Sequence, residues 1–362
     1  MPRGVVVVTG AGGGVGRRLV RRLGQDRGLR RIVAVDRAVA TWRDPRVEAH
    51  RLHLGRPQAF EALEAAFAGA DTVVHLAFDA DTERQAVRTR RLNLATTRQV
   101  LDAATTAGVR HLVVLSSATV YGAWANNPSP LTEDAPLRPN PDFAYAVQRA
   151  EVEQLVADWA GAEPGRRVAV LRPCTALAET GTGWLARALA TAAVRRLGDD
   201  AEVWQFLHLD DLAAALDVAR RARLDGPFNV APDGWIPGST VRALAGVPAR
   251  PQVPVWLAVL VAHVGWRVRR GPMPPGLLPY VTTTWVVAND RLRAVGWEPS
   301  RTNEQAFVAG TPGPWWTVVT PKRRQELALG GLVVSSIALP ALVVGGVRRL
   351  IRGRRRRSTG AS

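Results

Sequence analysis

The sequence has almost no cysteine, which excludes two classes of structure. Cys174 is the one cysteine among 362 residues, so an internal disulfide framework and a four-cysteine zinc site are both ruled out. The N-terminus also lacks the long apolar run of a signal peptide, because MPRGVVVVTG passes directly into a strand-like segment. We therefore expect neither an export signal nor a metal site.

Acidic residues are scarce at the C-terminal end, and this accounts for about half of the net charge of +17. Residues 322–362 hold ten Lys or Arg and a single acid, Glu326, so residues 1–321 carry a net charge of only +8. No aromatic residues are interleaved with the terminal arginines, and no nucleic-acid-binding fold is indicated. We therefore expect no nucleic-acid partner.

The residues that are present predict a nucleotide-binding turn near the N-terminus. Residues 5–23, VVVVTGAGGGVGRRLVRRL, predict a strand buried on both faces, a glycine turn and a helix. Gly10, Gly13 and Gly16 form GxxGxxG, in which the missing side chains let the backbone and the helix N-terminus approach a pyrophosphate.

The second predicted strand, RIVAVD at residues 31–36, supports the same interpretation. It ends in Asp36, twenty residues beyond Gly16, where a carboxylate would accept hydrogen bonds from the ribose hydroxyls of the adenosine. A carboxylate would repel a 2′-phosphate, so the sequence favours NAD over NADP. Arg37, directly after Asp36, keeps NADP open as a second cofactor.

Strands and helices alternate through the first third of the chain. We expect a helix at 58–68, a strand at 71–77, a helix at 83–107 and a strand at 111–117. This order predicts an α/β fold with a doubly wound parallel sheet, the Rossmann fold.

Several motifs in the correct order resemble one known family. They are TGAGGGVG (9–16), DTVVHLA (71–77), SSATVYG (116–122), LRP (171–173) and FLHLDDLAAAL (206–216), and they are accompanied by a YxxxR at 145–149. Over residues 4–310 the chain resembles the extended short-chain dehydrogenase/reductases, and within them the UDP-glucose 4-epimerase-like branch of the NAD-dependent epimerases and dehydratases. The resemblance does not identify a substrate.

The resemblance implies a role for each matching residue. Gly10, Gly13 and Gly16 would hold the pyrophosphate of NAD and Asp36 the ribose, while Ala77 would lie along the cofactor. Asn93 would bind near the cofactor or support it. Ser117 matches the catalytic serine or threonine of the family, and Tyr145 matches its acid/base. His53 and Gly55 stand where the family usually has acids, one of which helps to hold the adenine, so we expect weaker cofactor binding.

Arg149 is the main departure, since it occupies the position of the family's lysine. A cation next to a phenol favours the phenolate that removes a hydroxyl proton, and the i,i+4 spacing places Tyr145 and Arg149 on one helical face. Arginine keeps the charge but loses the compact ammonium that binds the nicotinamide ribose. Two interpretations stay open: a working site, or an impaired one in which Arg149 points to solvent beside Glu153.

The rest of the chain is predicted to form a substrate lobe and a tail. We divide it into a dinucleotide-binding domain (1–172), a smaller substrate lobe interleaved with late Rossmann elements (173–315), a basic linker (316–326), an apolar helix (327–347) and an arginine-rich tail (348–362). In the lobe, Asp210 is predicted to cap a helix over 211–223.

Residues 327–347, LALGGLVVSSIALPALVVGGV, are the strongest feature outside the family pattern. They hold 21 residues without a charge, long enough to cross a hydrocarbon core as a helix. Arginines on both sides oppose a span that begins in the cytoplasm. We therefore expect attachment to the cytoplasmic face of a membrane, with spanning or half-insertion left open. Residues 253–266 are too short to span and predict a core or an interfacial helix.

The sequence thus predicts an NAD-dependent enzyme with epimerase/dehydratase-like chemistry on a small molecule. A nucleotide sugar is the favoured substrate. Two alternatives remain: a membrane-associated reductase or dehydrogenase of an apolar sterol or lipid alcohol, and a non-catalytic NAD-binding scaffold. The resemblance leaves a homodimer open.

Overall fold

The computed structural model describes residues 4–38, 41–81, 83–195, 202–246, 253–268 and 273–311. Chain contacts divide the protein into two compact units, Met1–Pro312 and Gly313–Ser362. The predicted apolar helix at 327–347 and the arginine-rich tail lie outside the described residues. Within the described ranges, every helix is too short or too polar to cross a membrane.

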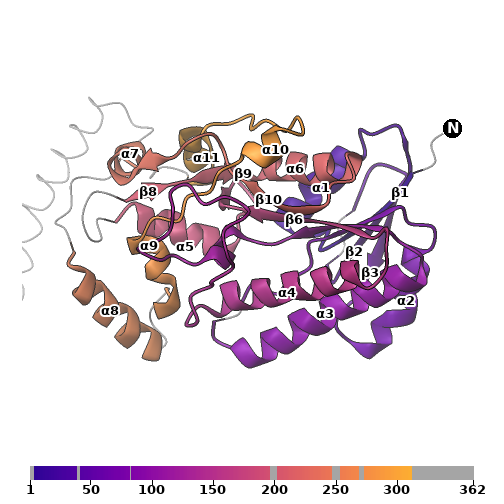
Figure 1. Ribbon diagram of the computed structural model, residues 1–362, viewed down its shortest axis with the longest axis horizontal. Coiled ribbons are helices and arrows are strands. Elements are labelled where there is room, and N and C mark those ends of the chain that lie inside the picture. Colours follow the sequence, from indigo (N-terminus) through magenta and orange to yellow (C-terminus); the bar gives the residue numbers. More distant parts are fainter. Residues whose placement is uncertain are drawn as a thin grey trace, which may run out of the picture. The chain divides into compact units, whose positions relative to one another are not determined.

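A seven-stranded sheet forms the centre of the described unit (Figure 1). Its order is β10-β6-β5-β4-β1-β2-β3, and every neighbouring pair is parallel. The strands are β1 (Gly4–Thr9), β2 (Leu29–Asp36), β3 (Val47–Arg51), β4 (Thr72–His75), β5 (His111–Leu115), β6 (Arg167–Pro173) and β10 (Gly226–Val230). The doubly wound parallel sheet predicted from the sequence is confirmed.

Helices cover both faces of this sheet, as Figure 1 shows. One face is covered by α1 (Gly14–Leu23) and α6 (Leu209–Arg221), and the other by α2 (Phe60–Phe67), α3 (Ala86–Thr106) and α4 (Ala144–Gly161). The four valines of β1 are shared between the two layers: Val6 and Val8 belong to one core cluster, Val5 and Val7 to the other. A strand buried on both faces needs such a continuous apolar run.

The later part of the chain builds a smaller lobe with a core of its own. Two short sheets belong to it, a parallel pair of β7 (Thr175–Leu177) with β9 (Phe206–His208) and an antiparallel pair of β8 (Val203–Trp204) with β11 (Ile236–Pro237). The remaining elements are α5 (Trp184–Ala193), α7 (Gly238–Leu244), α8 (Val255–Arg267), α9 (Pro279–Thr282), α10 (Asp290–Arg293) and α11 (Asn303–Gly310), with the 3₁₀ turns η1 (Pro57–Ala59), η2 (Ala118–Tyr121) and η3 (Pro275–Leu277).

Two details of the sequence prediction were wrong. The edge strand β3 was not predicted, because its exposed residues give no apolar run. The helix α6 begins at Leu209 and is capped by His208, whose side chain accepts the backbone N–H of Asp210 at 3.1 Å. Asp210 instead lies in the first turn of α6 and pairs with Arg18 of α1 at 2.8 Å.

Candidate active site

The glycine turn after β1 has the geometry that a bound pyrophosphate requires. Gly10 has a φ of +75°, and a Cβ there would come within 2.7 Å of the backbone nitrogen of Ala77. A Cβ on Gly16 would collide with the carbonyl oxygen of Gly10. Gly13 is the N-cap of α1 and is exposed. The side-chain-free turn therefore brings the free N–H groups of α1 to an open surface.

Asp36 lies at the carboxyl end of β2, directly against this turn. Its carboxylate accepts the backbone N–H groups of Gly12 and Ala38, each at 2.9 Å. A Cβ on Gly12 would come within 3.1 Å of a carboxylate oxygen of Asp36. Each carboxylate oxygen keeps a further lone pair for a ribose hydroxyl. The glycine turn and Asp36 together fit the pyrophosphate and the ribose of NAD.

Ala77 and Phe78 connect the glycine turn to α4, the helix that carries Tyr145 and Arg149. Ala77 touches Gly10, and the next side chain, Phe78, packs its ring against the guanidinium of Arg149 with 3.7 Å between the guanidinium carbon and the ring centroid. Phe78 also meets Tyr145 edge to face at 5.5 Å. The predicted cofactor turn and the predicted catalytic pair are thus neighbours in space.

Tyr145 and Arg149 lie one turn apart on α4, and both side chains are buried. Arg149 Nε donates to the Tyr145 hydroxyl at 3.3 Å, and Arg149 Nη1 donates to the carbonyl of Leu115, at the end of β5, at 2.6 Å. The backbone N–H of Tyr145 donates to Glu83 Oε1 at 2.9 Å. The arginine is therefore held in place, with its charge directed at the phenol.

This geometry contradicts the interpretation in which Arg149 points to solvent beside Glu153. Arg149 is 7% exposed, and Glu153 pairs with another arginine, Arg172 of β6, at 2.7 Å. Glu153 also accepts a hydrogen bond from Ser116. The sequence offered two i,i+4 partners for Arg149, Tyr145 and Glu153. The structure selects Tyr145, because Arg172 neutralises the carboxylate.

The Glu153–Arg172 pair belongs to a buried network that sequence reasoning missed. Arg172 Nη1 donates to the hydroxyl of Tyr121 at 2.8 Å, and Tyr121 donates to Asn229 Oδ1 at 2.7 Å. Burial raises the pKa of Tyr121 to about 12, although the charge of Arg172 opposes this. Arg172 lies in the LRP motif and Tyr121 in SSATVYG, but their contact joins residues 51 positions apart, which no local pattern signals.

Ser117 is buried at the start of η2, directly after β5. Its hydroxyl accepts from Thr119 twice, from the side-chain hydroxyl at 2.9 Å and from the backbone N–H at 3.3 Å. These bonds orient the hydroxyl while leaving its own proton to donate. The catalytic role that the resemblance gives Ser117 remains a prediction.

Asn93 has a structural role at this site. Its amide oxygen accepts the N–H of Asp79 at 2.7 Å, and its amide nitrogen donates to the Asp79 carbonyl and to Gln148. Asn93 therefore joins the loop after β4 to the catalytic helix α4. Direct contact with the cofactor, the other role proposed from the sequence, remains a prediction.

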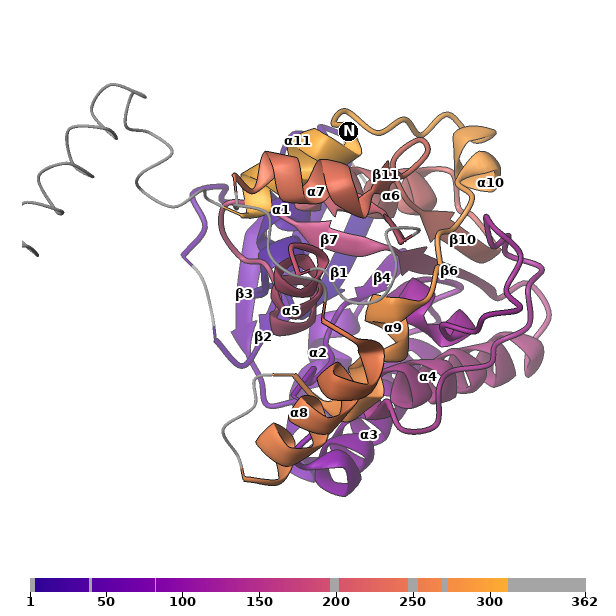
Figure 2. The same ribbon diagram turned by 90° about the vertical axis from the view of Figure 1, so that its left-hand side faces the viewer.

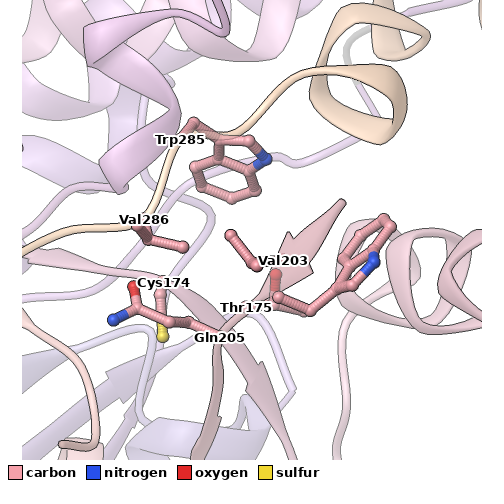
Figure 3. A pocket seen from close by; sticks show the side chains of 7 residues that line it. Cys174, Thr175, Val203, Gln205, Trp285 and Val286 are labelled. Carbon is pink, nitrogen blue, oxygen red and sulfur yellow. The ribbon is translucent and has the colours of Figure 1, made fainter. Parts of the chain in front are cut away.

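A small cavity of about 10 Å³ lies in the lobe, lined by Cys174, Thr175, Val203, Trp204, Gln205, Trp285 and Val286 (Figure 3). It has room for about one water molecule and is too small for a substrate. Gln205 is held there by the backbone of Val287, and burial raises the pKa of the Cys174 thiol. Both features are typical of core packing.

The family model of the NAD-dependent epimerase/dehydratase family matches residues 6–231. The chain belongs to the NAD-dependent epimerase/dehydratase family. The predicted resemblance is confirmed by this match, and NAD is the cofactor of the family. The predicted class, an NAD-dependent enzyme of this family, is likewise confirmed.

The individual proteins to which the chain is similar share about a fifth to a third of their residues with it. An uncharacterised protein of Mycobacterium tuberculosis is 29% identical over 316 residues, covering 84% of this chain and 82% of the relative. A 3-diazoavenalumate denitrifying reductase of Streptomyces is 34% identical over 226 residues, covering 59% and 68%. The NAD complex of UDP-glucose 4-epimerase from Thermus thermophilus is 21% identical with a TM-score of 0.64, covering 85% and 97%. At this identity the solved structure shares the fold.

Proposed function

We propose that this member of the epimerase/dehydratase family is a catalytically active oxidoreductase, in which Tyr145 and Arg149 form the proton-transfer pair. One observation carries the proposal: a buried guanidinium donates to the tyrosine hydroxyl at 3.3 Å, beside the loop that touches the glycine turn. Burial of a charge that has no carboxylate partner is costly, and Arg149 makes no such ion pair among the described residues. A pair that had lost its function would not require this arrangement.

The chemistry follows from the charges at the pair. Tyr145, as phenolate, removes the hydroxyl proton of a secondary alcohol, while the carbon that bears this hydroxyl loses hydride and becomes a carbonyl carbon. The reverse reaction reduces a ketone to the alcohol. Bound NAD supplies the hydride acceptor or donor. Arg149 stabilises the phenolate by its charge, and Ser117 hydrogen-bonds the reacting oxygen. The proton therefore passes between substrate and Tyr145 Oη.

A nucleotide sugar is the first substrate candidate. Its support is the ligand of solved proteins of this fold, since MoeE5 was crystallised with UDP-glucuronic acid and NAD. A diphosphate needs cations to bind it.

A second candidate is an apolar hydroxy or keto compound, and its support is the set of aromatic side chains that pack next to Tyr145. The cluster around Tyr145 includes Phe143, Tyr280 and the partly buried Phe78, Trp184 and Trp285. Phe143 lies 5.8 Å from Tyr145 and 5.0 Å from Tyr280, so the aromatic rings continue from the catalytic pair into the lobe. Aromatic walls hold apolar substrates by burial of surface rather than by charge.

One experiment separates these candidates. Purified protein with NAD⁺ or NADP⁺ is screened for cofactor reduction across nucleotide sugars and lipid or sterol alcohols, and calorimetry measures binding of free UDP and dTDP. A nucleotide-sugar enzyme binds the nucleotide alone, whereas an enzyme for apolar alcohols does not. Turnover that Tyr145→Phe leaves unchanged would refute the proposed pair, and NAD binding without any turnover would favour the non-catalytic scaffold.

We also propose that residues 327–347 attach the protein to the cytoplasmic face of a membrane. The support is 21 uncharged residues between KRR at 322–324 and RRLIRGRRRR at 348–357. Deletion of residues 322–362 should move the protein from the membrane fraction to the soluble fraction of a cell lysate. Full-length protein that stays soluble without detergent would contradict the attachment.

A further inference from the structure

The helix α8 inverts the usual distribution of side chains on a surface helix. Its buried residues are the small Ala258 and Ala262, whereas Trp256, Leu260 and Val264 are 67%, 52% and 53% exposed. A helix that packs on a protein core normally buries its large apolar residues. Trp256, Leu260 and Val264 therefore point away from the described part of the protein.

These residues form one continuous surface, which we call the α8 face. It consists of Val255, Trp256, Leu260, Val261, Val264 and Val268, all more than 40% exposed. Trp256, Leu260 and Val264 follow one another at i,i+4 spacing, and Val261 and Val268 lie beside them. Figures 1 and 2 both show α8 at the margin of the molecule, below α9. Contiguous apolar surface of this kind marks a site of interaction.

The charges in this region indicate what the α8 face contacts. From residue 250 to residue 270, the segment that contains α8, the sequence has four arginines and neither aspartate nor glutamate. Arg267 ends α8 and is exposed. An apolar helix face in a segment that carries only positive charge matches an anionic lipid surface, where apolar side chains enter the acyl boundary and arginines meet the headgroups.

We infer that the α8 face docks on the surface of an anionic bilayer, with α8 lying in the plane of the interface. At 13 residues α8 is too short to span a bilayer, so it contacts only one leaflet. This contact is distinct from attachment by residues 327–347, and it does not depend on the proposed reaction. It decides between the core and the interfacial helix that the sequence left open at residues 253–266.

The docked surface would lie close to the catalytic helix. The guanidinium of Arg84 stacks on the ring of Trp266, near the end of α8, at 4.1 Å. The preceding residue, Glu83, accepts the backbone N–H of Tyr145 at 2.9 Å. Glu83 and Arg84 therefore connect α8 with the first turn of α4, through Trp266 on the side of α8 that faces the protein.

A local probe on the full-length protein tests this inference. Leu260→Cys is labelled with an environment-sensitive fluorophore, and Val308→Cys on α11 is the matched control, because the two side chains are 52% and 51% exposed and α11 lies far from α8 in both views. Cys174 is buried and should not be labelled. Vesicles of phosphatidylcholine with phosphatidylglycerol are added, and vesicles of phosphatidylcholine alone serve as the charge control.

The inference predicts a blue shift at position 260, quenched by lipids that carry bromine on the acyl chain, with no change at position 308. Binding to the anionic vesicles should also weaken on the order of tenfold in Leu260→Glu, but not in Val308→Glu. Attachment through residues 327–347 alone would bring the protein to vesicles without changing the probe at 260, and this would overturn the inference. A blue shift of the probe at position 260 without vesicles would also overturn the inference. If this shift grows with protein concentration, a second copy of the protein covers the α8 face. If it does not depend on concentration, a segment of the same chain covers the face.

Discussion

Two buried tyrosine–arginine pairs lie in this protein, and they differ in what surrounds them. In one pair Arg149 donates to Tyr145 at 3.3 Å, and in the other Arg172 donates to Tyr121 at 2.8 Å. Tyr121 also donates to Asn229, and Arg172 is neutralised by Glu153. Arg149 makes no carboxylate ion pair within the described ranges, and its remaining partners are the Leu115 carbonyl and the ring of Phe78.

The comparison supports a structural role for the Tyr121–Arg172 pair and the proposed proton-transfer role for the Tyr145–Arg149 pair. The charge of Arg172 is already cancelled, and the hydroxyl of Tyr121 already has an acceptor, so neither group has capacity left for a substrate. The charge of Arg149 is available to the Tyr145 hydroxyl, and that hydroxyl retains its own proton. We therefore propose that the same two residue types stabilise the fold in one place and take part in proton transfer in the other.

The largest expected effect is on turnover. Tyr145→Phe should lower kcat by three to four orders of magnitude, because it removes the hydroxyl that is proposed to carry the proton. Tyr121→Phe should leave kcat within a fewfold and instead lower the free energy of unfolding by about 1–3 kcal/mol, since it leaves Asn229 and Arg172 without their partner. Steady-state kinetics and urea unfolding of both variants measure this. Equal losses of kcat would mean that the two pairs do not differ in role.

The next effect concerns the buried ion pair. Glu153→Gln should lower the free energy of unfolding by about 3–4 kcal/mol, because it leaves the charge of Arg172 buried and unpaired. The double variant Glu153→Gln with Arg172→Met removes that charge and should recover part of the loss. Urea unfolding of the single and double variants decides the point. A double variant less stable than the single one would contradict the assignment.

A smaller effect is expected at Arg149 itself. Arg149→Met should lower kcat about a hundredfold, because the phenolate form of Tyr145 loses its neighbouring cation. Arg149→Lys should keep the rate or improve it, since the charge remains and the ammonium restores contact with the nicotinamide ribose. If Arg149→Lys creates activity in a protein that otherwise has none, the arginine is what inactivates the site.

The smallest effect is a stability change with pH at His75, which lies in β4 near Arg149. Burial, and then the charge of Arg149, lower the pKa of His75 to about 3. The folded state therefore excludes a proton that the unfolded state binds below about pH 6.5, so stability is complete above that pH and is lost as the pH falls toward 3.

At pH 5 the loss from His75 should be about 2 kcal/mol relative to pH 7.5. His111 should add a loss of similar size, because burial lowers its pKa to about 4. Urea unfolding at the two pH values measures the combined loss from His75 and His111. The free energy of unfolding should differ less between the two pH values in the variant His75→Asn than in the unchanged protein. A pH dependence that His75→Asn leaves unchanged would assign the acid sensitivity to other groups.

The cofactor half of the fold could be predicted because its signals are local. The valine run, the three glycines and Asp36 lie within one strand–turn–helix–strand unit, where burial on both faces and the tight turn dictate the residue types. The same holds for the helical face that Tyr145 and Arg149 share, which the i,i+4 spacing of α4 sets. The substrate lobe has no comparable repeat, and its short strands pair with partners far along the chain.

The sequence by itself determined the fold class, the cofactor and the residues that meet along a single helix, because periodicity and spacing set which side chains share a face. Only the tertiary structure decided which of two neighbours Arg149 would contact. Arg172 of β6 forms an ion pair with Glu153. Phe78, in the loop after β4, packs its ring on the guanidinium of Arg149. Burial and partners distant in the chain decide which arginine pairs with Glu153. A buried carboxylate without a partner would cost more free energy than the contact of Arg149 with Tyr145 or with Phe78 contributes.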